Sequence, residues 1–132
     1  MSAVGRSVLA VLFVTLAVSA PTVVIAQETP RELVVDASGG GDYETISAAV
    51  AAADPGDTVT VRPGTYEESV RINESIRLVA PEGATLDGAA TTGTTAGIRI
   101  VGDAAPEIVG FTIREYRVGI DASDTSGDWL VR

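Results

Sequence analysis

The chain has 132 residues, enough for one domain, and its composition is strongly acidic. Nine basic residues, all of them arginine, stand against 18 acidic ones, so the formal net charge is −9 at pH 7. A surface of this sign repels nucleic acid and anionic lipid, and we expect neither as a partner. The sequence contains no cysteine, which excludes a disulfide framework.

The N-terminus has the features of a secretory signal peptide. Arg6 provides a positive start, and residues 8–20 form an apolar stretch rich in Val, Leu and Ala. Residues 24–26 favour cleavage before Gln27, whereas a cut after Ala20 would leave Pro21 at the new N-terminus, which signal peptidases disfavour. The alternative is an uncleaved anchor over residues 7–26, although Pro21 interrupts it. We expect a signal peptide at 1–26 and a secreted or cell-surface domain at 27–132.

The first elements after this segment are a predicted strand, turn and helix. Residues 32–36 predict a strand that ends in the glycine-rich turn at 38–42. A short helix over 45–53 follows, with Thr45, or Asp42 together with Thr45, at its start, and it ends at residues 54–56. The apolar residues on one face of this helix are Ile46, Ala49, Val50 and Ala53.

Two more strands are predicted before residue 75. Residues 57–62 alternate, with two valines on one face, and Pro63-Gly64 breaks this strand into a turn that leads to Tyr66 and Glu67. Residues 70–72 mark the next strand, which ends in a turn at 73–75.

A repeat with a constant step of about 22 residues runs from residue 75 to 132. Within each repeat, apolar residues alternate with polar ones, which is typical of a strand with one buried face. Equivalent positions under this step are Ile76, Ile98 and Ile120; Leu78, Ile100 and Ala122; Leu86, Ile108 and Leu130; Val79 and Val101; Gly88 and Gly110. The step predicts that each repeat is one coil stacked on the last.

These patterns predict an all-β fold, a β-solenoid with a short N-terminal capping α-helix. A stack cannot leave its first apolar layer open to water, and the small side chains of the 45–53 helix let it lie close to that end. About three to four coils are present, and the predicted strand at 128–132 leaves the last coil without a polar cap. We therefore expect a truncated portion of a longer β-helix, or a second chain over this end, and edge-to-edge self-association.

Three segments resemble the opening of right-handed parallel β-helix proteins of the pectin-lyase-like superfamily. They are residues 41–50 (GDYETISAAV), 54–57 (DPGD) and 61–68 (VRPGTYEE). The resemblance is to the start of pectin methylesterases and of NosD-like β-helix domains, covers about residues 33–132, and implies a right-handed coil. The same opening precedes enzymes, sugar-binding modules and surface proteins, so it implies a fold rather than an activity.

No catalytic residue carries over from this resemblance. In pectin methylesterases the paired Asp residues, the Arg and the oxyanion Gln residues come from later coils, and the only glutamine here is Gln27. A pectate-lyase-like site would need a basic residue beside calcium-binding carboxylates. Arg99, Arg114 and Arg117 are present, but the alternation predicts Arg99 and Arg114 as outward members of ordinary strands. We expect no catalytic site and no cofactor.

The sequence pattern most similar to a metal site consists of Asp121, Asp124 and Asp128. Oxygen ligands at short spacing with Gly127 between them suit calcium, but the spacing differs from that of an EF-hand loop, and a solvated acidic turn has the same composition. Copper, suggested by the NosD resemblance, prefers His, Cys or Met, and residues 27–132 contain none. We expect no metal site.

The remaining candidates lie in predicted turns or near residue 130. Asn73 begins an Asn-Glu-Ser sequon in a predicted turn and is our one candidate glycosylation site. The dipeptides at 87–88 and 102–103 are predicted turn residues. Trp129 is either a sugar-stacking platform or a residue packed beside Leu130 in a strand.

Two hypotheses for function follow. The first is an exported, non-catalytic β-helix module that contacts polysaccharide or cell-wall carbohydrate. The second is the N-terminal fragment of a polysaccharide-active enzyme, an esterase or lyase, without its catalytic coils. Catalysis would need paired carboxylates and an arginine facing one groove, and the sequence shows no such set, so we favour the first.

The balance of charged residues bears on the surroundings of the protein. The lysine-free, acidic composition resembles that of proteins from halophilic archaea. High salt would screen the self-repulsion of such a surface.

Overall fold

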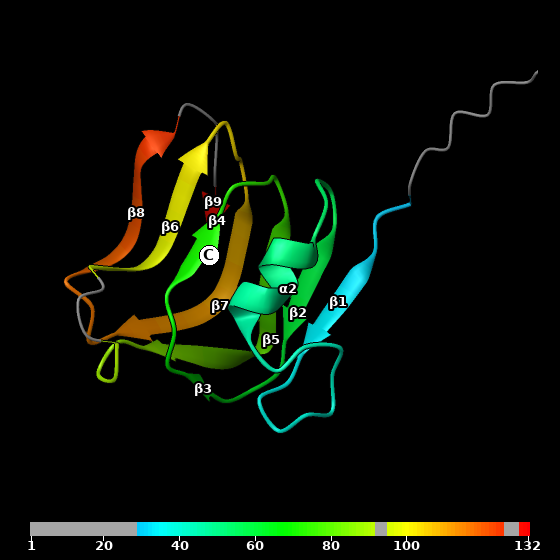
Figure 1. The fold of residues 1–132 in the computed structure, drawn as a ribbon, viewed down its shortest axis with the longest axis horizontal. Coiled ribbons are helices and arrows are strands. Elements are labelled where there is room, and N and C mark those ends of the chain that lie inside the picture. Colours follow the sequence, from blue (N-terminus) through cyan, green and yellow to red (C-terminus); the bar gives the residue numbers. More distant parts are fainter. Residues whose placement is uncertain (1–28, 92–94, 126–129) are drawn as a thin grey trace, which may run out of the picture.

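The described residues of the computed structural model, 29–91, 95–125 and 130–132, form a right-handed parallel β-helix of about four turns. Figure 1 shows the strands of successive coils as walls around a common interior. One short helix accompanies the strands within these residues. The predicted fold class is therefore confirmed.

Two parallel sheets make up the walls. The larger sheet has the order β1 (Glu32–Val35), β2 (Thr58–Val61), β5 (Arg77–Asp87), β7 (Glu107–Arg114), β9 (Leu130–Val131), with β3 (Thr65–Tyr66) also paired to β5. The smaller sheet has the order β4 (Val70–Ile72), β6 (Ala96–Gly102), β8 (Val118–Thr125). Residues 65–66, which follow the predicted turn at Pro63-Gly64, form a short strand because they pair with β5.

A bend in β5 and β7 gives each coil a third face. The register between these strands shifts between Val79 and Ala84, and Gly83 and Gly110 both have a positive φ, of 88° and 86°. A Cβ atom on Gly110 would lie 2.2 Å from the carbonyl oxygen of Ala80, so this position accepts only glycine without a shift of the backbone. The halves of β5 and β7 after the bend pair with each other, and β3 adds to them.

The interior is built from aligned apolar side chains. Leu33, Val59, Leu78 and Ile108 follow one another in register across β1, β2, β5 and β7. Each is at most 5% exposed, which stabilises the fold by about 1.5–3 kcal/mol per side chain. Each coil therefore supplies one layer of the core.

The predicted repeat holds in only one place. Ile98 pairs with Ile120 between β6 and β8, as expected. Leu78 does not pair with Ile100, which lies in the smaller sheet, but with Ile108, which lies further along the chain. The predicted pairing of these residues is therefore wrong.

Other pairings derived from the same repeat are wrong as well. The observed partners are Ile113 for Leu86, Val109 for Val79 and Val131 for Ile108. The segments that connect the strands differ in length, so the step changes from coil to coil. Alternation within each strand still assigned the inward face correctly, because it does not depend on that step.

Helix α2 (Ile46–Ala52) covers the first coil, as predicted. The hydroxyl of Thr45 accepts a hydrogen bond from the Ala48 N–H group at 3.2 Å and caps the helix. The helix packs against β4, β1 and β2, and its buried residues are Ile46, Ala49 and Val50. Its apolar face thus closes the interior at this end (Figure 1).

Glu68 fastens the helix to the coil beneath it. Its carboxylate accepts hydrogen bonds from the backbone N–H groups of Ile46 and Ser47, both at 2.8 Å. The carbonyl oxygen of Glu68 accepts a hydrogen bond from the hydroxyl of Tyr116, which follows β7. One residue therefore links the cap, the segment between β3 and β4, and a later coil.

The sequence predicts an N-terminal signal peptide, with an uncleaved membrane anchor as the alternative. The predicted signal peptide at 1–26 and the cleavage point at Gln27 lie outside the described residues. In the part that is described, no helix is long and apolar enough to cross a bilayer.

Replacement of Gly110 by alanine tests the bend. Gly110→Ala and Gly102→Ala both place a Cβ at a positive φ, but at Gly102 that atom would meet nothing within 4 Å. We expect Gly102→Ala to cost about 1 kcal/mol and Gly110→Ala about 3 kcal/mol or more, because only the second also clashes with backbone. Urea unfolding of both variants measures the difference, and equal losses would contradict the bend as described.

Candidate functional site

The third face of the coil carries a row of threonines. Thr65, Thr85 and Thr112 pair in register across β3, β5 and β7. Their neighbours along the strands, such as Leu86, point into the core, so the threonines point outward. We call Thr65, Thr85, Thr112, Asp87 and Arg114 the polar face.

The hydroxyl groups of this row are available to a ligand. None of the three forms a hydrogen bond with another residue in the described part of the chain. Thr65 and Thr112 are exposed and Thr85 is half-buried. Adjacent strands are about 4.8 Å apart, so the face offers evenly spaced groups that can both donate and accept.

An ion pair lies beside the threonine row. Asp87 and Arg114 occupy neighbouring positions in β5 and β7, and the Nε and terminal nitrogen of Arg114 lie 3.0 Å and 2.8 Å from one oxygen of Asp87. The other oxygen accepts a hydrogen bond from the Ala89 N–H group at 2.9 Å. That bond, and then Arg114, lower the pKa of Asp87, although burial opposes them. Asp87 is therefore an ionised, 8% exposed strand residue, and its assignment as a turn residue is wrong.

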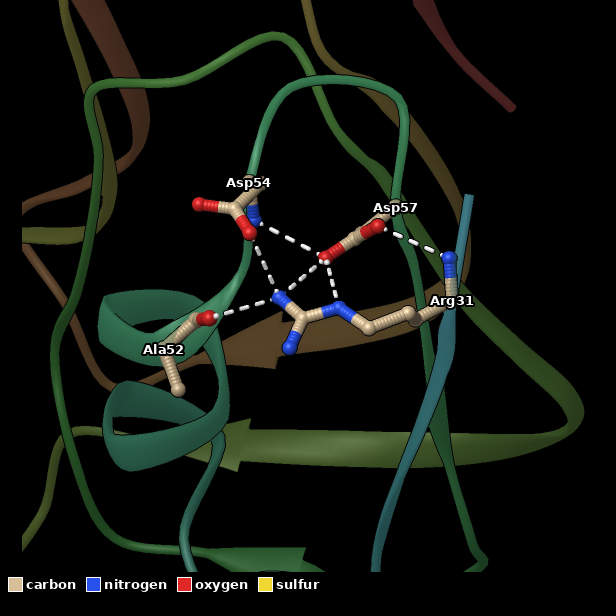
Figure 2. Close-up of polar contacts among 4 residues, drawn as sticks. All are labelled: Arg31, Ala52, Asp54 and Asp57. Atoms are coloured by element: carbon tan, nitrogen blue, oxygen red, sulfur yellow. Dashed lines mark hydrogen bonds and ion pairs between the residues drawn. The ribbon is translucent and has the colours of Figure 1, made fainter. Parts of the chain in front are cut away.

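A second cluster ties the start of the domain together (Figure 2). Arg31 donates to Asp57 through its backbone N–H at 2.8 Å and through its side chain at 2.8 and 3.1 Å. The same guanidinium contacts Asp54 at 2.8 Å and the carbonyl oxygen of Ala52 at 3.2 Å. The cluster joins residues at the start of β1, the end of α2 and the start of β2.

Backbone hydrogen bonds are the main cause of the lowered pKa of Asp57. Donation from the N–H groups of Arg31 and Asp54, followed by the Arg31 side chain, lowers its pKa from 3.8 to about 2. Two more carboxyls have a pKa below the ordinary value, mainly because serine groups donate to them: Asp36 receives bonds from Ser38, and Asp121 from Ser123. Such groups suit the binding of arginine, whereas a general acid at neutral pH needs a raised pKa.

The arginines discussed for a lyase-like site face outward. Arg99 and Arg114 are exposed on β6 and β7, which confirms the prediction from alternation. Arg99 lies 3.6 Å from Asp121, and Arg114 holds Asp87. Both arginines therefore contact carboxylates of neighbouring strands.

The predicted acidic triplet is only partly described. Asp121 is hydrogen-bonded to Ser123 and paired with Arg99, whereas Asp128 and the side chain of Asp124 lie outside the described residues. Among the side chains that are described, no three acidic, His or Cys groups lie close enough to hold a metal ion.

Two more candidates from the sequence were Asn73, for glycosylation, and Trp129, for stacking on a sugar. Asn73 is exposed in the connection between β4 and β5, where a turn was predicted. Trp129 lies outside the part of the chain that the structure describes.

Sequence reasoning missed the polar face. The interval from Thr65 to Thr85 is shorter than that from Thr85 to Thr112, so no constant step connects the three. In the sequence, each of these threonines precedes an apolar residue that faces inward: Tyr66, Leu86 or Ile113. This alternation predicts that each threonine faces outward, but only the register of β3, β5 and β7 shows that the three are aligned.

The fold and the polar face define the chain as a right-handed parallel β-helix domain with a row of three outward threonines on one face. A family model described as "Protein of unknown function (DUF1565)" matches residues 35–124, and the chain belongs to this family. No curated protein and no solved structure matched the chain.

The pH dependence of stability tests the Asp57 cluster. Because the folded pKa lies below the unfolded value of 3.8, Asp57 stabilises the fold fully above pH 3.8, and this contribution is lost as the pH falls through about 2. Asp57→Asn should be less stable than the wild type at pH 7, and the difference should shrink on acidification over that range. Chemical denaturation between pH 7 and 2 measures it.

A matched charge change provides the control. Glu44→Gln also removes one negative charge, at an exposed position with no ion pair among the described residues. A constant difference between wild type and Asp57→Asn at every pH, or the same profile for Glu44→Gln, would contradict the assignment.

Proposed function

We propose that this chain is an exported, non-catalytic β-helix module that contacts carbohydrate through the polar face. The observation that carries the proposal is the row of Thr65, Thr85 and Thr112, whose hydroxyls are not engaged with other described residues. Sugar hydroxyl groups both donate and accept hydrogen bonds, and threonine hydroxyls match them in this respect.

The adjoining ion pair supports the same contact. Arg114 uses two of its nitrogen atoms on Asp87, its side chain remains 58% exposed, and a guanidinium has five N–H donors. Because Asp87 holds the guanidinium in place, the remaining donors can bind a hydroxyl with little loss of side-chain entropy. With a net charge of −9, the chain favours a neutral sugar over an anionic one.

Export is part of the proposal and rests on the sequence. The apolar stretch at 8–20 after Arg6, with small residues at 24–26, supports secretion. The exposed position of Asn73 supports its use as a glycosylation acceptor. The alternative of an esterase or lyase fragment rests on the resemblance alone, and no contact among the described residues favours it.

Removal of the hydroxyl groups tests the contact with carbohydrate. Valine has the shape of threonine and favours strands, so Thr85→Val with Thr112→Val removes two hydroxyls and keeps the sheet. At about 1 kcal/mol for each lost hydrogen bond, binding to an insoluble polysaccharide should weaken about thirtyfold. Depletion assays with cellulose, chitin, mannan and xylan measure it.

The control is a threonine on another face. Thr58 lies on β2 and pairs with Arg77, in the part of β5 before the bend, and its hydroxyl forms no hydrogen bond with another described residue. Thr58→Val should bind as well as the wild type. Equal weakening by this variant, or no retention of the wild type by any of the four polysaccharides, would contradict the proposal.

The mass of the protein recovered from the medium of the producing cells tests export and modification. We expect a chain that begins at Gln27 and carries a glycan that Asn73→Gln removes. Retention of residues 1–26 would contradict cleavage. An identical mass increment in Asn73→Gln would contradict glycosylation at this residue.

A further inference from the structure

Glu67 adds a carboxylate beside the polar face, at the end of β3. It follows Tyr66 directly, and because Tyr66 is 3% exposed and faces the core, Glu67 lies on the outward side, as Thr65 does. The side chain of Glu67 is exposed and forms no hydrogen bond or ion pair with another described residue. The polar face therefore borders on a carboxylate that has no counter-ion among the described residues.

The strand register places Glu67 in one row with the ion pair of the polar face. Tyr66 pairs with Leu86, so the next position along the strands brings Glu67 beside Asp87, which pairs with Arg114. Neighbouring strands are about 4.8 Å apart. The row thus contains two carboxylates and one arginine, and carboxylates on adjacent strands repel each other.

Arg114 compensates the charge of Asp87 rather than that of Glu67. Two of its nitrogen atoms bind one oxygen of Asp87, at 3.0 and 2.8 Å, and the N–H group of Ala89 binds the other oxygen. Arg114 itself lies on β7, two strands away from β3. The row therefore carries one uncompensated negative charge, and this charge is located at Glu67.

The groups around Glu67 suit an organic cation better than a metal ion. Among the described side chains, no three acidic, His or Cys groups lie close enough to hold a metal ion. An ammonium group has three N–H donors and needs acceptors, and Glu67 supplies a charged one. Thr65, two residues earlier on the same side, supplies a hydroxyl about 7 Å along the strand. A sugar that carries both an amine and hydroxyl groups matches this pair.

We propose that the polar face binds polysaccharides that contain amino sugars, with the ammonium group of a sugar at Glu67 and its hydroxyl groups on the threonine row. This inference rests on the proposed carbohydrate contact and adds the class of sugar to it. The net charge of −9 attracts a cationic polymer to the protein. The uncompensated charge at Glu67 determines where the amine of that polymer binds.

Chitin and deacetylated chitin are suitable probes, because they differ in the charge on the sugar nitrogen. In a mildly acidic buffer the free amine of deacetylated chitin is protonated, whereas the acetylated nitrogen of chitin is neutral. In depletion assays the full chain should bind deacetylated chitin more tightly than chitin. Glu67→Gln should weaken binding to deacetylated chitin about fivefold, because one exposed ion pair is lost, and should leave binding to chitin unchanged.

Glu74→Gln is the matched control. It removes one negative charge from the connection between β4 and β5, outside the polar face, and the side chain of Glu74 forms no hydrogen bond or ion pair with another described residue. This variant should bind deacetylated chitin as the wild type does. Equal weakening by both variants would indicate a general attraction between opposite charges and would overturn the inference. Loss of the preference for deacetylated chitin in the presence of a chelator would indicate a metal ion at Glu67 and would overturn it as well.

The amino-sugar assignment and the carbohydrate contact can fail separately. Equal binding of chitin and deacetylated chitin by the wild type would overturn the assignment and leave the carbohydrate contact in place. Retention of the wild type by none of the polysaccharides, deacetylated chitin included, would overturn both.

Discussion

The stacking of inward apolar side chains from one coil to the next is the interaction on which this structure depends. Leu33, Val59, Leu78 and Ile108 are each buried because a neighbouring coil covers them. A single coil cannot bury its own inward face, so stability arises between coils rather than within them. It follows that each end of the stack needs a cover.

Helix α2 provides that cover at one end, and Glu68 ties it to the coil beneath it. The carboxylate of Glu68 satisfies two N–H groups at the start of the helix, which have no partner inside a helix. Tyr116 holds the carbonyl of the same residue from a later coil. Acidic residues elsewhere act similarly: Asp57 and Asp87 bind arginine and backbone N–H groups between elements. The described part of this acidic chain thus uses several carboxylates as structural ties.

The sequence predicted what depends on local pattern and failed where chain register decides. Alternation identified the strands and the outward Arg99 and Arg114, and the apolar face with Thr45 identified the capping helix. The pairing of Leu78 with Ile108 was missed because the length of a connection leaves no mark on strand periodicity. The polar face was missed for the same reason, since it exists only once β3, β5 and β7 are aligned.

Backbone NMR contacts between strands test the central claim, the order of stacking, most directly. The structure predicts nuclear Overhauser effects between backbone protons of residues 77–79 and those of 107–109, and between residues 98–99 and 120–121. Backbone contacts of residues 77–79 with residues 99–101 instead, as the uniform step of the predicted repeat would require, would contradict this account of the fold.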